Sequence, residues 1–390
     1  MEKWSKVKLG EIAFITSSKR IFAREYQKEG IPFYRGKEII EKHNGNSVST
    51  ELYISKKRYD EIKSKYGVPV PGDILLSSVG TLGVPWLVDE EKFYFKDGNL
   101  TWLRCNEKCI PKFLYLWFNS AEAKNQIEVM CIGSTQKALT IDALNKFNVS
   151  LPPLEVQKKI CNVIYSIMDK IRTNDEINRN LSEQAKILYK EWFIDFGPFE
   201  GEMPGAWHLG TVEEIIELHD SKRKPLSGRQ RDDMEKIYPY YGATSIMDYV
   251  DNYIFDGIYL LLGEDGSVID TEGYPILQYV FGKFWPNNHA HVITGKNGFS
   301  VEMLYLLFSL TNVQNIVTGA VQLKISQQNL KTVEVVVPSY EAITEFDEMI
   351  QPIFREIRRL RTENEKLTTL RDNLLPKLMS DELDVSNLDI

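Results

Sequence analysis

The segment GSTQKALTIDALNKFNVSLPPLEVQKKI, residues 133–160, has a second copy later in this 390-residue chain. The copy is GAVQLKISQQNLKTVEVVVPSYEAITEF, residues 319–346, at an offset of 319 − 133 = 186 residues. Extended without a gap to Leu188 and Leu374, the match contains 13 identities in 56 positions. Unrelated segments of ordinary composition would share roughly 3–4. A constant offset over such a length indicates an internal duplication.

Fainter echoes precede both copies. The paired segments are KLGEI (8–12) and HLGTV (208–212), IPFYRG (31–36) and YPYYGA (238–243), and GDILLSSVGTLG (72–83) and GIYLLLGEDGSV (257–268). Short β-branched and aromatic runs between Gly, Asn and Pro predict two β-rich mixed globular units. Each unit is expected to contain one amphipathic helix near its end, around residues 112–130 and 301–314. Each should close with a strand that stops at a proline, Pro152 or Pro338.

A long helix is predicted after each closing strand. Residues 154–196 lack Gly and Pro, and apolar residues recur there at spacings of four and three, which is typical of a coiled-coil heptad seam. The predicted seam residues are Ile160, Ile164, Ile167, Ile171, Asn178, Leu181 and Leu188, and in the second helix Ile350, Ile353, Ile357, Leu360, Asn364, Leu367 and Leu374. If the first helix leads from one unit to the other, the second must return. An antiparallel pair with pseudo-twofold symmetry is therefore expected, with a length of roughly 60 Å for about 40 residues.

Two positions in the helices leave alternatives open. Asn178 and Asn364 both fall at heptad position a, where a buried asparagine would fix the register; alternatively, both face solvent where the helices splay. Pro352 lies inside the second seam. The second helix should therefore start at this residue or kink there.

These patterns predict an α+β fold with an internal pseudo-twofold repeat. Two β-rich mixed globular domains are joined by two long antiparallel helices that form a coiled coil. The expected segments are a first domain at 1–152, a central spacer helix at 153–198, a second domain at 199–338, and a C-terminal spacer helix with a tail at 339–390.

Composition narrows the class of protein. The sequence contains no apolar run of 18–20 residues and no signal-peptide core at its N-terminus, so no membrane segment is expected. Cys105, Cys109, Cys131 and Cys161 lack CxxC spacing and are interpreted as reduced thiols of a cytoplasmic protein, with zinc binding by the first two as the alternative. The net charge of −8 hides an asymmetry: residues 1–152 carry 23 Lys+Arg and 18 Asp+Glu, or +5, whereas residues 201–338 carry 10 and 17, or −7.

Catalytic signatures are missing from the sequence. We find no GxxxxGK[ST] phosphate loop, no dinucleotide-binding turn and no Asn-Pro-Pro-aromatic motif. His289 and His291 should share one face of a strand. They suit a polar surface role or a structural pair better than a metal site, because no carboxylate lies nearby at ligand spacing. No catalytic residue and no metal ligand is predicted.

Cations cluster in loops at matching places of the two units. SSKRIFAR (17–24) and DSKRKPLSGRQR (220–231) both follow the first strand of a unit and combine Ser, Lys and Arg in a way that suits phosphate contact. Together with the aromatic residues Tyr34 and Tyr241 and the Gln-bearing segments GSTQKALT (133–140) and TGAVQLKIS (318–326), they predict a DNA-binding surface. Its candidate residues are Lys19, Arg20, Arg24, Tyr34, Arg35, Lys37, Lys57, Arg58, Thr135 and Lys137 in the first unit, and Ser221, Lys222, Arg223, Lys224, Arg229, Arg231, Tyr241, His289, His291 and Gln322 in the second.

The order of these motifs resembles that of a known family. GSTQKALT, a strand ending in LPPLEVQKKI and a long heptad helix, followed by a weaker second set, resemble the specificity subunit of type I restriction–modification systems. The resemblance spans the whole chain. The second copy departs from the pattern, since Ser339 replaces the second proline and Ile343 stands where Gln157 stands in the first.

The resemblance implies a role in DNA recognition. Each globular unit would be a target recognition domain that reads one half of an asymmetric, bipartite site in double-stranded DNA. The helices would dock two DNA methyltransferase (modification) subunits and, in systems that cut DNA, a translocating restriction subunit. S-adenosylmethionine, ATP and magnesium would be bound by those partners, and this chain would be non-catalytic without a cofactor of its own. The competing hypothesis is an adaptor with two β-rich modules on a coiled-coil rod that binds proteins, which the acidic second half favours.

Overall fold

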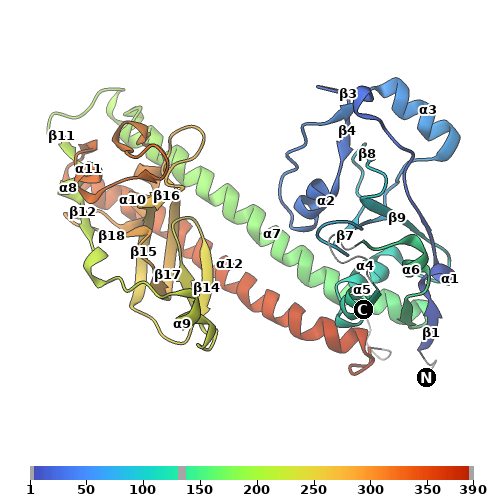
Figure 1. Cartoon of the computed structure of the whole chain (residues 1–390). Helices are drawn as coiled ribbons and strands as arrows, with labels where there is room; N and C mark the ends of the chain where they lie inside the picture. The colour runs from blue at the N-terminus through green and yellow to red at the C-terminus, as the bar shows by residue number, and fades with distance from the viewer. Residues whose placement is uncertain (1–3, 131–137, 386–390) are drawn as a thin grey trace. The chain divides into compact units, whose positions relative to one another are not determined.

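The computed structural model describes residues 4–130 and 138–385 and divides the chain into two compact units (Figure 1). Unit 1 comprises Met1–Ile171 and Glu365–Ile390, and unit 2 comprises Arg172–Asn364. The two long helices, α7 (Leu154–Phe193) and α12 (Tyr340–Met379), each begin in one unit and end in the other. Each unit therefore contains a globular part and portions of both helices.

Unit 1 is built from small sheets and short helices. Its strands are β1 (Ser5–Lys8), β2 (Ala13–Thr16), β3 (Tyr26–Gln27), β4 (Ile31–Tyr34), β5 (Tyr53–Ile54), β6 (Ile74–Ser77), β7 (Pro85–Leu87), β8 (Tyr94–Phe95), β9 (Leu100–Cys105) and β10 (Asn148–Leu151). Its helices before α7 are α1 (Leu9–Ile12), η1 (Ala23–Glu25), α2 (Gly36–His43), α3 (Lys56–Tyr66), α4 (Pro111–Phe118), α5 (Ala121–Met130) and α6 (Ile141–Asn145). The sheet orders are β1-β10, β2-β9-β6-β7 and β3-β5-β4-β8.

Unit 2 has a larger sheet. Its strands are β11 (His208–Thr211), β12 (Ile216–Leu218), β13 (Tyr238–Tyr241), β14 (Ile246–Val250), β15 (Phe255–Gly263), β16 (Asp265–Gly266), β17 (Leu277–Pro286), β18 (Ala290–Gly295), β19 (Leu323–Lys324) and β20 (Glu334–Val337). Its helices besides α7 and α12 are η2 (Gly197–Phe199), α8 (Val212–Ile215), η3 (Asp220–Lys222), α9 (Gly228–Asp232), α10 (Val301–Ser309), η4 (Gln314–Ile316) and α11 (Gln327–Lys331). The sheet orders are β11-β20, β12-β18-β15-β17-β13-β14 and β16-β19.

The pairing of strands repeats between the units. In each, the first strand pairs antiparallel with the closing strand, as β1 with β10 and β11 with β20. The order β2-β9-β6 corresponds to β12-β18-β15, and the parallel pair β4–β8 corresponds to β13–β17. The predicted α+β fold and internal repeat are confirmed by this shared frame. The single amphipathic helix expected at residues 112–130 is instead two helices, α4 and α5, because the chain turns at Asn119 and Ser120.

The predicted strand-to-helix junctions are present in both units. β10 ends before Pro152 and α7 begins at Leu154; β20 ends before Pro338 and α12 begins at Tyr340. Gln157 is fully buried and donates to the carbonyl oxygens of Pro152 (2.9 Å) and Lys108 (3.0 Å). Ile343 takes this place in the second copy and is buried in the apolar core, so the same joint is held by polar contacts in unit 1 and by packing in unit 2.

The two long helices run antiparallel, as contacts inside unit 2 show. Tyr189 of α7 packs against Phe346 of α12, whereas Asn174 lies earlier on α7 and bonds to the later Asn364. The predicted seam residues are all buried or half-buried. In unit 1, Ile160 and Ile164 of α7 share a core with Leu374 of α12.

The polar positions of the seam differ from the expectations in detail. Asn178 is only 8% exposed, so the alternative that it faces solvent is wrong. One turn earlier on α7, Asn174 Nδ2 donates to Asn364 Oδ1 (2.8 Å), and Asn364 Nδ2 donates to Asp175 Oδ1 (2.8 Å). Pro352 neither starts nor ends α12, which begins twelve positions earlier; the proline lies on the exposed side, where water can satisfy the carbonyl that loses its helical partner.

Candidate nucleic-acid interface

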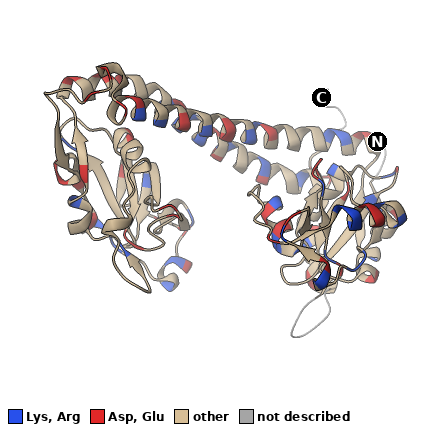
Figure 2. Ribbon diagram, turned by 90° about the horizontal axis from the view of Figure 1, so that it is seen from above, with Lys and Arg blue, Asp and Glu red and all other residues tan. Residues whose placement is uncertain are grey.

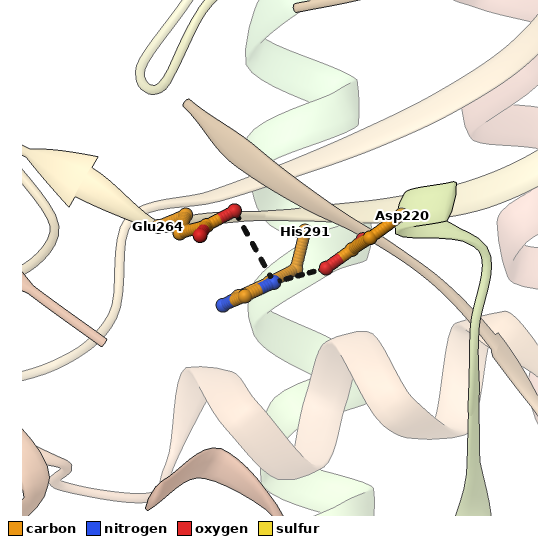
Figure 3. Close-up of side chains that lie close together, drawn as sticks. All are labelled: Asp220, Glu264 and His291. Carbon is orange, nitrogen blue, oxygen red and sulfur yellow. Dashed lines mark hydrogen bonds and ion pairs between the residues drawn. The ribbon is translucent and has the colours of Figure 1, made fainter. Parts of the chain in front are cut away.

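A buried polar cluster lies in unit 2, where the basic segment Asp220–Arg231 begins. Asp220 comes from η3, Glu264 follows β15, and His291 lies in β18 (Figure 3). His291 Nδ1 is 2.6 Å from Asp220 Oδ2 and 3.7 Å from Glu264 Oε2, and its side chain is fully buried. Three potential metal-ligating atoms thus lie within 4.8 Å of one another.

The hydrogen bonds define the roles of the imidazole and the carboxylate. His291 Nε2 lies 2.8 Å from the carbonyl oxygen of Ile325, which can only accept, so Nε2 is a donor. Burial alone would raise the pKa of Asp220, but hydrogen bonds from His291 and the Val292 amide, with the nearby charges, bring this pKa below its ordinary value. Asp220 Oδ2 lies 2.6 Å from His291 Nδ1, so the imidazole is held through both of its ring nitrogens.

Arg223 supplies positive charge to this cluster. Its Nη1 donates to Glu264 Oε2 (2.7 Å) and to the carbonyl oxygen of Ala290 (2.6 Å), while Nη2 lies 3.4 Å from Asp220 Oδ2. Its side chain is 11% exposed. The guanidinium contacts both carboxylates, and Lys324 Nζ lies 3.4 Å from Glu264 Oε1, so two cations of the chain face the two carboxylates. The arrangement therefore favours a structural network over a metal centre.

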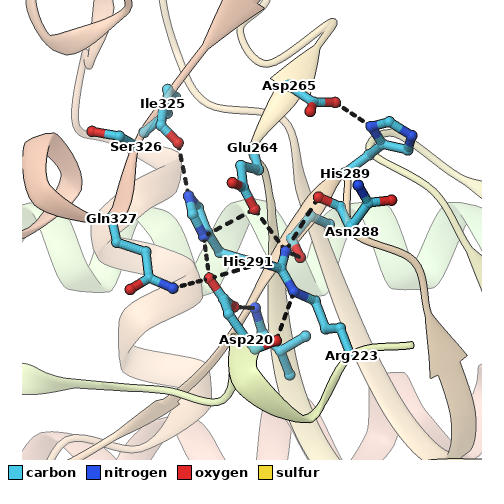
Figure 4. Close-up of polar contacts among 12 residues, drawn as sticks. Asp220, Arg223, Glu264, Asp265, Asn288, His289, His291, Ile325, Ser326 and Gln327 are labelled. Carbon is cyan, nitrogen blue, oxygen red and sulfur yellow. Dashed lines mark hydrogen bonds and ion pairs between the residues drawn. The ribbon is translucent and has the colours of Figure 1, made fainter. Parts of the chain in front are cut away.

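The cluster also fixes the Gln-bearing repeat segment (Figure 4). Gln327 Nε2 donates to Asp220 Oδ2 (2.5 Å), and the Ile325 amide donates to the carbonyl oxygen of Glu264 (2.9 Å). Lys324 Nζ lies 3.4 Å from Glu264 Oε1. The basic segment and the Gln-bearing segment, about a hundred residues apart in sequence, are therefore held together at one place.

Just before this anchor the chain forms a tight hairpin, residues Thr318–Lys324. The two end residues exchange backbone hydrogen bonds of 2.9 and 2.8 Å. Gly319 has φ +91°, and a Cβ there would lie 2.1 Å from the carbonyl oxygen of Gln322, so the turn requires glycine. Val321 and Gln322 at the tip are exposed, and Val321 is as exposed as in an extended chain.

Unit 1 anchors its corresponding segment in the same way. The Leu139 amide donates to the carbonyl oxygen of Ser78 (2.9 Å), and adding 186 to both numbers gives the Ile325–Glu264 bond of unit 2. Ser78 Oγ lies 2.6 Å from Thr101 Oγ1. A neutral pair of hydroxyls thus stands where unit 2 has Glu264 and His291. The candidates Thr135 and Lys137 belong to this segment but lie outside the described residues.

The other basic candidates of unit 1 lie in its loops and helices, and Figure 2 marks Lys and Arg along the ribbon. Lys19, Arg20, Arg24, Lys37 and Lys57 are exposed. Of these, Arg20 pairs with Asp97 (2.8 Å) and Lys19 Nζ lies 4.5 Å from the centre of the Tyr66 ring. Arg35 and Arg58 are half-buried in ion pairs with Glu38 (2.8 Å) and Glu25 (2.9 Å).

In unit 2 the candidates divide into exposed and engaged groups. Exposed candidates are Ser221, Lys222, Lys224, Arg229 and Gln322. Arg231 pairs with Asp248 (2.6 Å), Tyr241 packs on Phe284 with 5.8 Å between ring centres, and His289 pairs with Asp265.

Three candidates are corrected by the structure. Tyr34 is buried, and its hydroxyl donates to Glu91 (2.7 Å); burial and this bond raise the pKa of Tyr34. His291 and Arg223 point into the polar cluster, so neither presents a free polar edge at the surface. The expectation that the two histidines share a strand face without nearby carboxylates was also wrong: His289 precedes β18, and each histidine contacts its own aspartate.

Sequence reasoning missed Glu264, Lys324 and Gln327. Glu264 is 27 residues from His291 and 44 from Asp220 in sequence, so no local spacing indicates their meeting. The offset of 186 residues between the closing segments, applied to Ser78, gives Glu264, whereas the pairing of residues 72–83 with 257–268 has an offset of 185 and places Val79 opposite Glu264. Within residues 4–130 and 138–385, no helix has the length and apolarity to cross a membrane.

Comparisons with known proteins agree on one family. The family model for the type I restriction modification DNA specificity domain matches residues 1–186 and 204–370. A Haemophilus influenzae protein named as a type I restriction enzyme specificity subunit is 32% identical over 142 residues, 36% of each chain. The MjaIX specificity subunit of Methanocaldococcus jannaschii is 24% identical and aligns over 72% of this chain and 70% of its own. The crystal structure of the type I restriction–modification S subunit from M. genitalium shares the fold, with a TM-score of 0.59, 16% identity and coverage of 97% and 96%.

Proposed function

The chain belongs to the family of type I restriction–modification DNA specificity proteins, and from this premise we propose that it selects an asymmetric, two-part DNA sequence for partner enzymes. Each unit reads one half-site. The observation that carries the proposal is the repeated anchor: Leu139 in unit 1 and Ile325 in unit 2 make the same backbone bond, to Ser78 and to Glu264. The backbone bond is the same in both units, whereas the side chains around it differ.

The differences between the units support an asymmetric target. After β4, unit 1 continues into α2, whereas after β13 unit 2 turns into β14. The anchor itself is a pair of hydroxyls in unit 1 and a charged network in unit 2. Two surfaces with different side chains read different bases, because sequence is recognised by the donors, acceptors and methyl groups at base edges.

In this proposal the chain carries no catalysis of its own. Two modification subunits dock on it and transfer methyl groups from S-adenosylmethionine, and a restriction subunit that uses ATP and magnesium joins them where DNA is cut. The exposed cations Lys19, Arg24, Lys222 and Lys224 contact phosphates and position the duplex.

The test is selection from randomised DNA by the chain co-purified with its modification subunits. The expected outcome is enrichment of one sequence with two specified parts and a fixed gap. Substitutions at the unit 2 hairpin should change one part and leave the other unchanged. A pool without enrichment, together with stable binding of partner proteins in the absence of DNA, would instead support the protein-binding adaptor.

A further inference from the structure

The hairpin Thr318–Lys324 of unit 2 ends in an exposed tip. It is closed by two backbone hydrogen bonds, and its base pairs with β16 through Lys324 and Leu323. Its tip carries no charge: Ala320, Val321 and Gln322 are all exposed. A single exposed valine is ordinary on a protein surface. Here, however, it lies beside the glutamine amide at the tip of a short anchored hairpin.

The base of the hairpin is held by the buried polar cluster. Ile325, the next residue, donates its amide proton to Glu264 and accepts from His291, and Gln327 donates to Asp220 (Figure 4). Three of these anchoring residues are buried: Ile325 and His291 are fully enclosed and Asp220 is 8% exposed. Such support reduces the conformational freedom that the tip would lose on binding.

The chemistry of the tip fits a base pair. The major groove of DNA admits a two-stranded β-ribbon, and its A·T pairs present the thymine methyl group beside the N6 donor and N7 acceptor of adenine. A valine side chain can contact that methyl group, and a glutamine amide can bond to N6 and N7 together. Neither side chain suits a phosphate as lysine does. We propose that Val321 and Gln322 read an A·T base pair in the major groove of the half-site bound by unit 2, an inference that rests on the proposed DNA recognition.

Two exposed lysines next to Arg223 can supply the phosphate contacts that the uncharged hairpin tip lacks. Lys222 and Lys224 are exposed on either side of Arg223, and Arg223 is bonded to the same Glu264 that anchors the hairpin. Phosphate contacts set the position of a protein on the duplex, while base contacts set sequence preference. The two lysines should therefore control the salt dependence of binding, and the hairpin tip should control the identity of one base pair.

The experiment combines protein variants with modified bases in the complex of the full chain and its modification subunits. For Gln322→Ala, we expect discrimination at one A·T position to fall on the order of tenfold, with an unchanged salt slope. For wild-type protein, dU in place of the recognised dT should weaken binding severalfold, because only the methyl group is lost. Val321→Ala should cause a similar loss on dT and show no further loss on dU.

Controls separate this inference from the proposed function. Leu209, in β11, is also strongly exposed at 71%, so Leu209→Ala should leave affinity and sequence preference unchanged. If wild type selects a sequence but both tip variants keep its preference at every position, the inference is wrong. Equal weakening by Val321→Ala on dT and dU sites would also overturn it. If the wild-type complex selects no DNA sequence, the proposed function itself fails.

Discussion

At the scale of single residues, Arg223 shows where sequence reasoning stops. Its segment correctly predicts a cluster of cations, yet the side chain turns inward to Glu264 and the carbonyl of Ala290, which are 41 and 67 residues away. A side chain's partners at such separations are set by the register of β15 and β18, which no local pattern contains. Tyr34 was misassigned for the same reason, since its partner Glu91 lies 57 residues away.

Arg223 is accordingly expected to act on stability. Arg223→Ala leaves Glu264 and Asp220 without their guanidinium in a nearly buried site, so it should lower the free energy of unfolding by about 3 kcal/mol. Urea denaturation of the full chain measures this. The neighbouring exposed Lys222 is the matched control: Lys222→Ala should leave stability unchanged and reduce the salt slope of DNA binding by about one. A normal urea midpoint for Arg223→Ala would contradict the structural role.

We predict that protonation of Asp220 lowers the stability of unit 2 at acidic pH. Its pKa in the folded state lies below its ordinary value, so the unfolded chain takes up a proton at higher pH than the folded chain. The stabilisation is complete above the ordinary pKa near 4 and is lost as the pH falls through the folded value. Thermal unfolding between pH 6 and pH 2.5 should show a smaller loss of stability in Asp220→Asn than in wild type. Parallel curves would argue against a depressed pKa.

At the scale of elements, the long helices were the most predictable part of the fold. Their heptad spacing is local, so it specified both length and apolar face before any tertiary contact was known. The second helix does not start at Pro352, because a proline on an exposed helix face removes one backbone hydrogen bond without ending the helix. The attachment of α12 to unit 2 was not predicted. Besides apolar packing, it includes Arg358, whose Nη1 donates to the buried Glu302 (2.6 Å) of α10, which also accepts from Tyr279 (2.6 Å) of β17.

The contact between Arg358 and Glu302 predicts that a single substitution at Glu302 will lower the free energy of unfolding. Glu302→Gln removes the charge that Arg358 and Tyr279 share, in a side chain only 4% exposed. We expect a loss of about 2–3 kcal/mol in the free energy of unfolding. Glu356→Gln is the control, because its pair with Arg359 is 43% and 57% exposed and should matter by less than about 0.5 kcal/mol. Equal urea midpoints for the two variants would disprove the anchoring role.

At the scale of the whole molecule, the repeat made the architecture predictable because one offset relates the closing segments and long helices, and the earlier paired segments recur in the same order at other offsets. The offset aligns the junction prolines Pro152 and Pro338 and the anchor bonds of Leu139 and Ile325. It could not predict where the copies diverge, as at α2 and β14, since duplicated frames accept different loops with little cost to the core. The repeat therefore could not predict the structure of the surfaces at which the two copies differ in sequence.

The connection between the two units gives the last prediction. If α7 and α12 set the gap between half-sites, removing one heptad from each should shorten it by about 10 Å, or roughly three base pairs, while keeping the seam in frame. Thr173–Arg179 and Arg359–Glu365 are the heptads to remove. They carry Asn174 and Asn364 and leave Ile164 and Ile350 in the cores of their own units. DNA selection should recover both half-sites unchanged with a shorter gap. An unchanged gap in a folded, DNA-binding variant would show that the helices do not set the spacing, and altered half-sites would point to damaged recognition units.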